Sequence, residues 1–245
     1  MQTCAIIVPC YNEAGRLQAE RFTRFLQDKP DVICIFVNDG SSDNTLAVLQ
    51  EIKSELPQQV HILSLPENRG KAEAVRAGLL EAVQKENTGF AGYLDADLSA
   101  SPDLFYELFK QVRDNGYAYV FGSRIRMLGT TIKRRFFRHA AGRFIATLVD
   151  HAFQLGIYDT QCGAKCFRKE IIPAVFNTPF STRWLFDVEI FLRIRKEWPG
   201  ARGLEYPLRH WENVSGSKLG LRHFPRIMRE IRLLKKNYRT KQPGQ

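Results

Sequence analysis

The sequence has no run of about 18 consecutive apolar residues, and no basic N-terminal stretch leads into an apolar core. We therefore expect neither a membrane-spanning helix nor a signal peptide, and we predict a cytoplasmic protein. The five cysteines form no Cys-x-x-Cys pair, which argues against zinc and fits reduced thiols in a core. Gly-x-Gly-x-x-Gly and Gly-x-x-x-x-Gly-Lys are also missing, which argues against a dinucleotide enzyme and a P-loop ATPase.

Hydrophobic residues make up 44% of the 245 residues, which is enough for one large α/β core with or without an added lobe. Short apolar runs, typical of buried strands, alternate with segments whose apolar residues recur at helical spacing. Strands are expected at 3–9, 32–37, 60–65, 90–94 and 117–123, and helices at about 14–27, 46–56, 71–83 and 102–115. This alternation predicts a central, mostly parallel sheet with right-handed crossovers and helices on both faces.

Polar residues follow the end of each expected strand. They are Tyr11 to Glu13, Asp39 to Ser41, Asn68 to Lys71, Asp95 to Asp97, and Ser123 with Arg124. In a parallel sheet the carboxyl ends of the strands share one edge, and ligands bind beyond that edge. Each loop alone is compatible with ordinary turn chemistry, but the five together predict a binding site there.

Asp95 and Asp97 come directly after the apolar run 90–94. Side chains two residues apart on an extended chain point the same way, so both carboxylates can reach one Mg²⁺ or Mn²⁺ that also holds substrate phosphates. Alternatively, Asp97 only opens the next loop, because Asp is a common turn residue. A calcium loop of the EF-hand type is excluded, because Ala100 and Tyr106 stand where its glycine and its bidentate Glu belong.

The net charge of +10 is distributed unevenly. Residues 1–100 carry nine Lys and Arg against fourteen Asp and Glu, so the basic surplus lies in the second half. It is concentrated in 124–143 and 209–241, where aromatic residues stand among the charges. This pattern predicts an anionic partner such as a membrane surface, or else a solvated charged face. A nucleic-acid-binding protein is the alternative on charge alone; the acidic first half and the lack of a reader motif argue against nucleic acid.

A basic amphipathic helix is expected at the C-terminus. Its apolar stripe is Phe224, Ile227, Met228, Ile231, Leu234 and Tyr238. A helix packed on a core would show the same stripe, so packing and membrane docking both stay open. We expect a main domain at 1–218 and this basic helix with its tail at 219–245. Another helix is expected from Thr131 to about Leu155.

Four segments in this order resemble the GT-A fold of family 2 inverting glycosyltransferases. They are Val8 to Glu13, Asn38 to Asp43, Asn68 to Ala72, and Asp95 to Asp97. Asp159 to Lys165, Trp184 to Glu189 and Gly216 to Lys218 resemble the polyprenyl-phosphate branch, closest to dolichyl-phosphate glucosyltransferases and bacterial undecaprenyl-phosphate relatives. The resemblance covers roughly residues 4–220. Asn38 and Ala164 depart from it, because Asp and a bulky apolar residue are frequent at those positions.

The resemblance implies roles for particular residues. The nucleoside would be held by Pro9, Tyr11, Glu13 and Asp39, with Asp39 on the base. Asp95 and Asp97 would hold Mg²⁺ or Mn²⁺, and Lys71 and Ala96 would also lie at the nucleotide-sugar site. Arg124 and Lys218 would neutralise the diphosphate or the lipid phosphate, and Asp159 matches an active-site carboxylate. The implied catalytic set is Asp97, Arg124 and Asp159.

The activity implied by the resemblance is metal-dependent, inverting transfer of a hexose from a nucleotide sugar to a polyprenyl phosphate. The enzyme would act at the cytosolic face of a membrane, either peripherally or through an integral membrane partner. Glu212 stands where mannosyl-transferring relatives tend to carry Arg, which favours UDP-glucose over GDP-mannose. The alternatives are another nucleotide sugar, such as UDP-GlcNAc, and extension of a polysaccharide.

Overall fold

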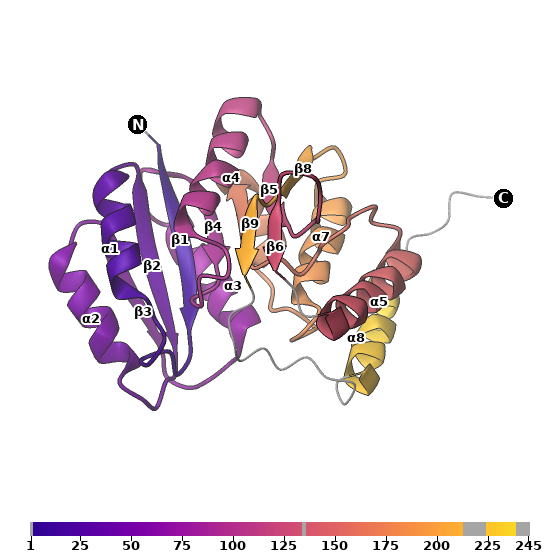
Figure 1. Cartoon of the computed structure of the whole chain (residues 1–245), viewed down its shortest axis with the longest axis horizontal. Helices are drawn as coiled ribbons and strands as arrows, with labels where there is room; N and C mark the ends of the chain where they lie inside the picture. The colour runs from indigo at the N-terminus through magenta and orange to yellow at the C-terminus, as the bar shows by residue number, and fades with distance from the viewer. Residues whose placement is uncertain (1, 134–135, 213–223, 239–245) are drawn as a thin grey trace.

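The computed structural model describes residues 2–133, 136–212 and 224–238. At its centre is a seven-stranded sheet with the order β3-β2-β1-β4-β7-β5-β8 (Figure 1). Its strands are β1 Thr3–Cys10, β2 Val32–Asp39, β3 Val60–Leu65, β4 Thr88–Leu94, β5 Tyr119–Ser123, β7 Ala164–Arg168 and β8 Gly203–Pro207. Of these strands β7 runs antiparallel to its neighbours β4 and β5, and the other pairs are parallel. The prediction of a mostly parallel sheet is confirmed.

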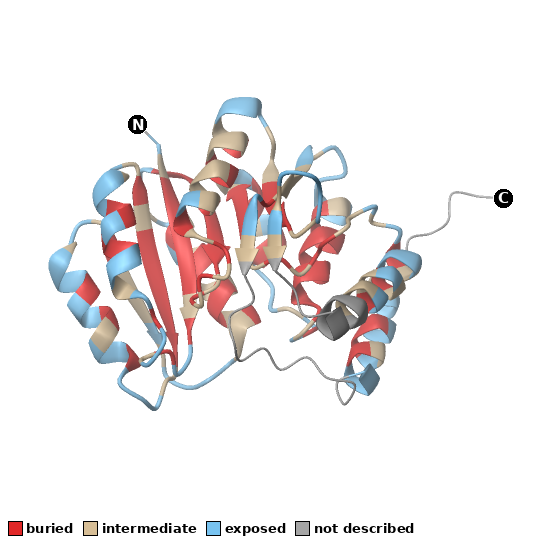
Figure 2. Cartoon of the chain, viewed as in Figure 1, coloured by how far each residue is buried: buried red, intermediate tan, exposed pale blue. Residues whose placement is uncertain are grey.

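Helices cover both faces of the sheet, so its strands are largely buried (Figure 2). They are α1 Ala19–Asp28, α2 Thr45–Glu55, α3 Lys71–Val83, α4 Pro102–Asn115, α5 Phe136–Phe153, α6 Ile172–Phe176, α7 Phe186–Glu197 and α8 Phe224–Asn237, with a 3-10 turn at Lys169–Ile171. One hydrophobic cluster joins α1, α2 and α4 to one face, and a second joins α3, α6 and α7 to the other. The expected layering of helix, sheet and helix is present.

The ends of α4 illustrate how the sequence defines an element. The Ser101 hydroxyl accepts a hydrogen bond from the Leu104 N–H at 3.2 Å, and Pro102 occupies the first helical position. Gly116 closes the helix with a φ of 71°, in the left-handed region that glycine adopts without strain. Both boundaries agree with the prediction, because both depend on residues next to each other in the chain.

Two predicted helices begin later than expected. The first starts at Ala19 instead of residue 14, because the Glu13 and Ala14 N–H groups donate to the Thr45 hydroxyl at 2.8 and 3.1 Å. The second does not include Thr131. Instead, β6 (Thr131–Lys133) pairs in parallel with β9 (His210–Glu212), and α5 follows it. The β-branched residues of β6 favour this extended backbone.

The C-terminal helix α8 packs against α5 and α7 at one end of the sheet (Figure 1). The buried residues of this third cluster are Ile145, Val149, Phe153, Leu185, Val188, Leu192, Ile227, Ile231 and Leu234. Three members of the predicted stripe are therefore core residues, whereas Phe224 is exposed. The predicted boundary at residue 218 lies outside the described residues and stays a prediction.

Glu230 of α8 also secures the start of α7. Its Oε2 accepts hydrogen bonds from the backbone N–H groups of Trp184 at 3.0 Å and Leu185 at 2.8 Å. These N–H groups precede the first turn of α7, where a carboxylate also interacts favourably with the helix dipole. The one acidic side chain of α8 is therefore buried at a helix end.

All five cysteines are buried and have free thiols, as predicted. Burial raises the pKa of Cys162, next to the predicted site, to about 11, so that its thiol is protonated at neutral pH. None of the described helices combines the length and the apolar character needed to cross a bilayer.

Candidate active site

The loops that follow β1 and β2 are hydrogen-bonded to each other at the carboxyl edge of the sheet. Asn12, with a φ of 53°, accepts a hydrogen bond from the Ser42 N–H at 2.9 Å through its side-chain oxygen. The Glu13 carboxylate lies beside them and accepts two hydrogen bonds from Arg16, at 2.5 and 2.6 Å. Tyr11 is 46% exposed at the same edge. The two loops therefore form one surface, and the exposed ring of Tyr11 is available there to contact a ligand.

Asp39 joins the end of β2 to the loop before α3. Its two carboxylate oxygens accept hydrogen bonds from the N–H groups of Arg69 and Gly70, each at 2.8 Å. Gly40 allows this approach, because its φ is 61° and a Cβ there would lie 2.4 Å from the carbonyl carbon of Glu67. Asp39 thus orders the loop that leads to Lys71, and its role on a nucleotide base stays a prediction.

Lys71 begins α3 and reaches the carboxylate after β4. Its Nζ lies 2.5 Å from Asp95 Oδ1, with both side chains partly exposed. Burial of the ammonium acts to lower the pKa of Lys71, but the charges of Asp95 and Asp187 outweigh it and the pKa is raised. Burial in turn raises the pKa of Asp95, an effect that Lys71 only partly offsets. Lys71 is therefore the cation that balances Asp95.

The oxygens of Asp95 and Asp97 suit a divalent cation. Asp95 Oδ1 is buried and makes an ion pair with Lys71. Asp97 uses Oδ1 to accept a hydrogen bond from the Ser99 N–H at 3.0 Å. Across the described residues, no group of three or more His, Cys, Asp or Glu could enclose a metal. Such a pair fits an Mg²⁺ or Mn²⁺ that takes its other ligands from phosphates and water.

Gly163 lies directly against Asp95. The Asp95 N–H donates a hydrogen bond to the Gly163 carbonyl at 3.0 Å. A Cβ on Gly163 would lie only 2.0 Å from Asp95 Oδ2, so that any side chain would displace the carboxylate. The loop before β7 therefore sets the position of Asp95.

Arg124 and Asp159 form the most extensively bonded ion pair at this edge. The guanidinium donates from Nε and Nη2 at 2.6 and 2.7 Å, and the Arg124 backbone N–H donates to the same carboxylate at 3.0 Å. Trp211 lies beneath the guanidinium, 5.4 Å from its centre. Burial acts to lower the pKa of Arg124, but the charge of Asp159 and its hydrogen bonds outweigh burial and raise the pKa above its usual range. Arg124 is therefore a permanent, oriented cation.

The sequence that builds this edge of the sheet matches a family model. The model of glycosyl transferase family 2 matches residues 5–176. The chain belongs to glycosyl transferase family 2. It is 34% identical over 240 residues to the dolichyl-phosphate β-glucosyltransferase of Drosophila melanogaster, covering 88% of this chain and 68% of the relative. It is 30% identical over 233 residues to the enzyme of the same name from Dictyostelium discoideum, with the same two coverages.

Solved glycosyltransferases share the fold. The glucosyl-3-phosphoglycerate synthase of Mycobacterium tuberculosis, crystallised with Mn²⁺, UDP and glucosyl-3-phosphoglycerate, superposes with a TM-score of 0.69. That comparison covers 99% of this chain and 82% of the other at 15% identity. This glycosyltransferase therefore has the predicted GT-A fold.

The structure brings most of the predicted residues of this glycosyltransferase to one edge. Pro9, Tyr11, Glu13, Asp39, Lys71, Asp95, Ala96, Asp97, Arg124 and Asp159 all lie at or just beyond the carboxyl ends of β1, β2, β4 and β5, at the start of α3, or in the loop before β7. Lys218 lies outside the described residues, and so does the predicted loop Gly216 to Lys218. The roles assigned to these residues stay predictions.

A buried charged group behind the site was missed in the sequence. Lys165 Nζ donates to Asp187 at 2.6 Å and to the carbonyls of Thr160 and Cys162 at 3.0 and 2.7 Å. The Tyr93 hydroxyl also donates to Asp187. Burial, reinforced by Asp187, raises the pKa of Tyr93 and keeps the phenol neutral. The available signal was Lys165 itself, because a lysine within a buried apolar strand requires a partner.

Glu205 of β8 was also missed. Its carboxylate accepts hydrogen bonds from the Ser123 hydroxyl at 2.6 Å, the Asp159 N–H at 2.8 Å and the Tyr158 N–H at 2.9 Å. Nothing in the sequence near residue 205 identifies these partners, because they lie 46, 47 and 82 positions away.

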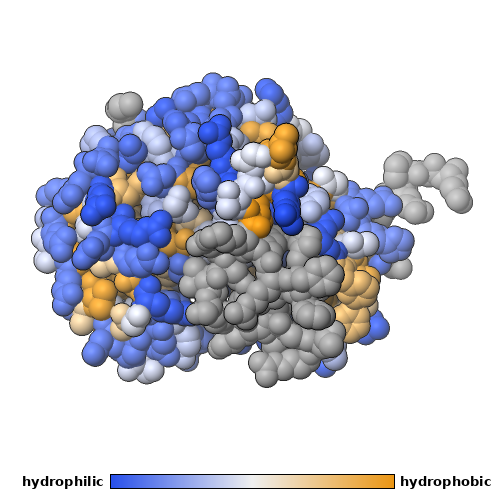
Figure 3. Space-filling model, viewed as in Figure 1, coloured by the Kyte–Doolittle hydropathy of each residue, from blue (hydrophilic) through white to orange (hydrophobic). Residues whose placement is uncertain are grey.

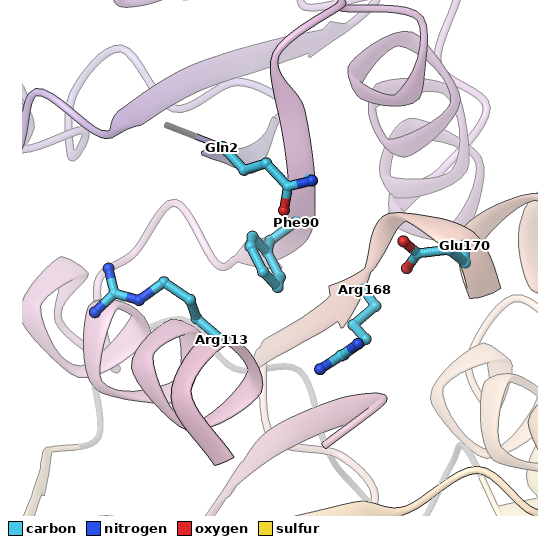
Figure 4. A pocket seen from close by; sticks show the side chains of 6 residues that line it. Gln2, Phe90, Arg113, Arg168 and Glu170 are labelled. Carbon is cyan, nitrogen blue, oxygen red and sulfur yellow. The ribbon is translucent and has the colours of Figure 1, made fainter. Parts of the chain in front are cut away.

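One pocket of this enzyme lies away from the site. It has a volume of about 390 Å³ and is lined by Gln2, Gly89, Phe90, Arg113, Arg168 and Glu170 (Figure 4). Most of these residues stand at the amino ends of β1 and β4 or at the end of the antiparallel β7, which is the opposite edge of the sheet, and Arg113 comes from the last turn of α4. The pocket therefore has no part in the site described above.

Proposed function

We propose that this enzyme transfers glucose from UDP-glucose to a polyprenyl phosphate at the cytosolic face of a membrane, with inversion at the anomeric carbon. The observation that carries this proposal concerns the loop before β7. Its residue Gly163 lies against Asp95, close in the chain to Asp97, and its residue Asp159 binds Arg124. This arrangement offers one place for a cation with a diphosphate and another for a second phosphate. The names of the relatives and the UDP and Mn²⁺ of the structural neighbour support the choice of substrates.

On the donor side, Asp95 and Asp97 would hold Mg²⁺ or Mn²⁺, while Tyr11, Glu13 and Asp39 with Pro9 would hold the nucleoside. When bound, the cation would supply positive charge to stabilise the departing diphosphate. Lys71 starts a helix and lies against Asp95, so it would add a second positive charge beside the same phosphates.

On the acceptor side, Arg124 would bind the phosphate of the lipid. A phosphate is already anionic, so it needs neutralisation and orientation more than a general base. Asp159 occupies the Nε and Nη2 donors of the guanidinium and so orients its remaining N–H groups, which would donate to the phosphate. Attack from the face opposite the departing diphosphate would give the β-linked product.

A donor and acceptor screen analysed by product mass tests this proposal. UDP-glucose, GDP-mannose and UDP-GlcNAc are each incubated with undecaprenyl phosphate or with a free saccharide, with Mg²⁺ or Mn²⁺ and with EDTA. We expect a hexosyl lipid phosphate from UDP-glucose that EDTA abolishes. A product only on the saccharide, or only from another donor, would contradict the proposal.

Membrane binding would use the outer face of α8. Its exposed charged residues are Arg226, Arg229, Arg232, Lys235 and Lys236, whereas its acidic Glu230 is buried at the start of α7. The exposed Phe224 ring contacts that of Phe144 in α5, with centroids 6.0 Å apart. Apolar side chains are visible among hydrophilic ones at this end of the molecule (Figure 3). A cationic face with aromatic rings suits an anionic bilayer.

Vesicle sedimentation tests this surface. We expect the double variant Arg229→Glu/Arg232→Glu to lose binding to vesicles of phosphatidylcholine with phosphatidylglycerol, while retaining UDP binding. Each basic residue near an anionic surface contributes on the order of 1 kcal/mol, and raised salt should weaken wild-type binding in the same way. If the wild-type protein does not bind such vesicles, the result would point instead to an integral membrane partner.

A further inference from the structure

The segment 158–163 touches both parts of the site. At its start, the Asp159 carboxylate holds the Arg124 guanidinium, and at its end Gly163 lies against Asp95. Its placement therefore decides where the second phosphate would bind relative to the first. The groups that hold this segment are themselves charged and come from other elements.

Glu205 holds the start of the segment. Its Oε1 accepts from the Asp159 N–H and from the Ser123 hydroxyl, and its Oε2 accepts from the Tyr158 N–H. Ser123 is fully buried and directly precedes Arg124 in the chain. One carboxylate thus connects Ser123, the residue before Arg124, with Asp159, which binds the Arg124 guanidinium.

Lys165 holds the end of the same segment with the opposite charge. It is fully buried, and it donates to the carbonyls of Thr160 and Cys162 while pairing with Asp187. The backbone N–H groups of 158 and 159 therefore meet a carboxylate, and the carbonyls of 160 and 162 meet an ammonium. Charged hydrogen-bond partners of this kind are stronger than neutral ones and fix the backbone.

We propose that Glu205 is a positioning residue for the acceptor half of the reaction. It has no role on the substrate itself; it sets the loop so that Asp159 can orient the remaining N–H groups of Arg124 toward a phosphate. This inference rests on the proposed function for the identity of that phosphate. The donor half depends on the other end of the segment, so the two halves should respond differently when Glu205 is changed.

Glu205→Gln is the variant that tests this role. A carboxamide accepts hydrogen bonds on one atom only, so its NH₂ group would face one of the three donors that now bind the carboxylate. We expect KM for undecaprenyl phosphate to rise about tenfold, while Kd for UDP with Mn²⁺ changes less than about twofold. Glu197→Gln is the control, because Glu197 pairs only with its neighbour Lys196 among the described residues.

Hydrogen exchange separates this inference from the proposed function. In Glu205→Gln the amides of Tyr158 and Asp159 should exchange faster than in the wild type, whatever the acceptor is. If the wild type makes no glucosyl lipid but these amides exchange faster in the variant, the proposed function is wrong and the positioning of the loop stands. Unchanged exchange in a folded variant would overturn the inference.

Two further outcomes also decide against the role. An equal loss of UDP affinity and of acceptor affinity would mean that Glu205 supports the entire fold. If the wild type is active and Glu205→Gln has the same KM for undecaprenyl phosphate, then Glu205 does not position Arg124. If Glu205→Gln does not fold, Glu205→Asp keeps the charge with a shorter side chain, and the same measurements on it decide.

Discussion

The two sides of the site are held together by different kinds of contact. On the side of β1, β2 and β3, neighbouring loops bind each other through short polar contacts such as Asn12 with Ser42 and Asp39 with Gly70. On the side of β5 and β7, the site depends on two charged side chains, Glu205 from β8 and Lys165 from β7 itself. The first side thus spreads its support over several contacts between neighbouring loops, one of them made by the buried carboxylate of Asp39, whereas the second concentrates it in Glu205 and Lys165. Loss of one of these two charged side chains should therefore destabilise the second side more than loss of one contact destabilises the first.

Asp95→Asn and Asp97→Asn should have the largest effect, and they test the proposed metal site after β4, where the two sides meet. Removing one cation ligand should lower kcat by about 10³-fold or more, because the charge that stabilises the leaving diphosphate is lost. Mn²⁺ binding, measured by electron paramagnetic resonance, should weaken in parallel. Asp114→Asn is the control, since its described contact is with Arg113 on the surface. Near-normal turnover that still requires metal would remove these two residues from the metal site.

Lys165→Met tests the dependence of the second side on buried charge. Asp187 would lose its ammonium partner in the interior, so the free energy of unfolding should fall by about 3–5 kcal/mol. Chemical denaturation measures this change. Lys196→Met is the control, because Lys196 is exposed. The double variant Lys165→Met/Asp187→Asn should recover part of the loss. If Lys165→Met is as stable as the wild type, the second side does not depend on this buried charge and the two sides do not differ in this respect.

Gly163→Ala acts where the two sides meet. The added Cβ would have to displace the Asp95 carboxylate from a distance of 2.0 Å, so kcat/KM should fall by about 10²-fold. Gly142→Ala is the matched control, because nothing lies within 4 Å of the added atom and the position is helical. Gly142→Ala should leave activity intact. Equal activity in the two variants would mean that Asp95 tolerates displacement.

Glu230→Gln should have the smallest effect, on stability alone. Loss of the carboxylate at the start of α7 should cost about 1 kcal/mol of unfolding free energy and leave UDP binding intact. Thermal unfolding measures the cost, with Glu197→Gln as the control at the other end of α7. No change in Tm would mean that α8 contributes packing but no cap.

The first half of the fold could be predicted from the sequence because its determinants are local. The cap at Ser101, the stop at Gly116 and the carboxylates after β4 all lie within the elements that they define. The parallel topology of the sheet then brings the loops after these strands together at one edge. The later start of α1 was not predictable in this way, because it depends on Thr45, which comes 26 residues after Ala19.

The second half could be predicted only in part. The antiparallel insertion of β7 between β4 and β5 could not be predicted, because strand order is not a property of any one segment. The partners of Lys165 and Glu205 come from separate elements. The stripe of α8 fitted both a core and a membrane surface, and only the positions of α5 and α7 show that Ile227, Ile231 and Leu234 are core residues.

The position of β7 also has a consequence for how the chain folds during synthesis. The strands β1, β2 and β3 can pair with one another, and β4 with β1, as soon as about the first 94 residues have emerged. In contrast, β5 pairs with β7 and β8, and both follow it in the chain. Until β7 emerges, the outer edge of β4 is unpaired and exposed to association with other chains. A nascent chain that stalls between residues 123 and 164 would therefore be prone to aggregate, and chaperones would be needed most at that stage.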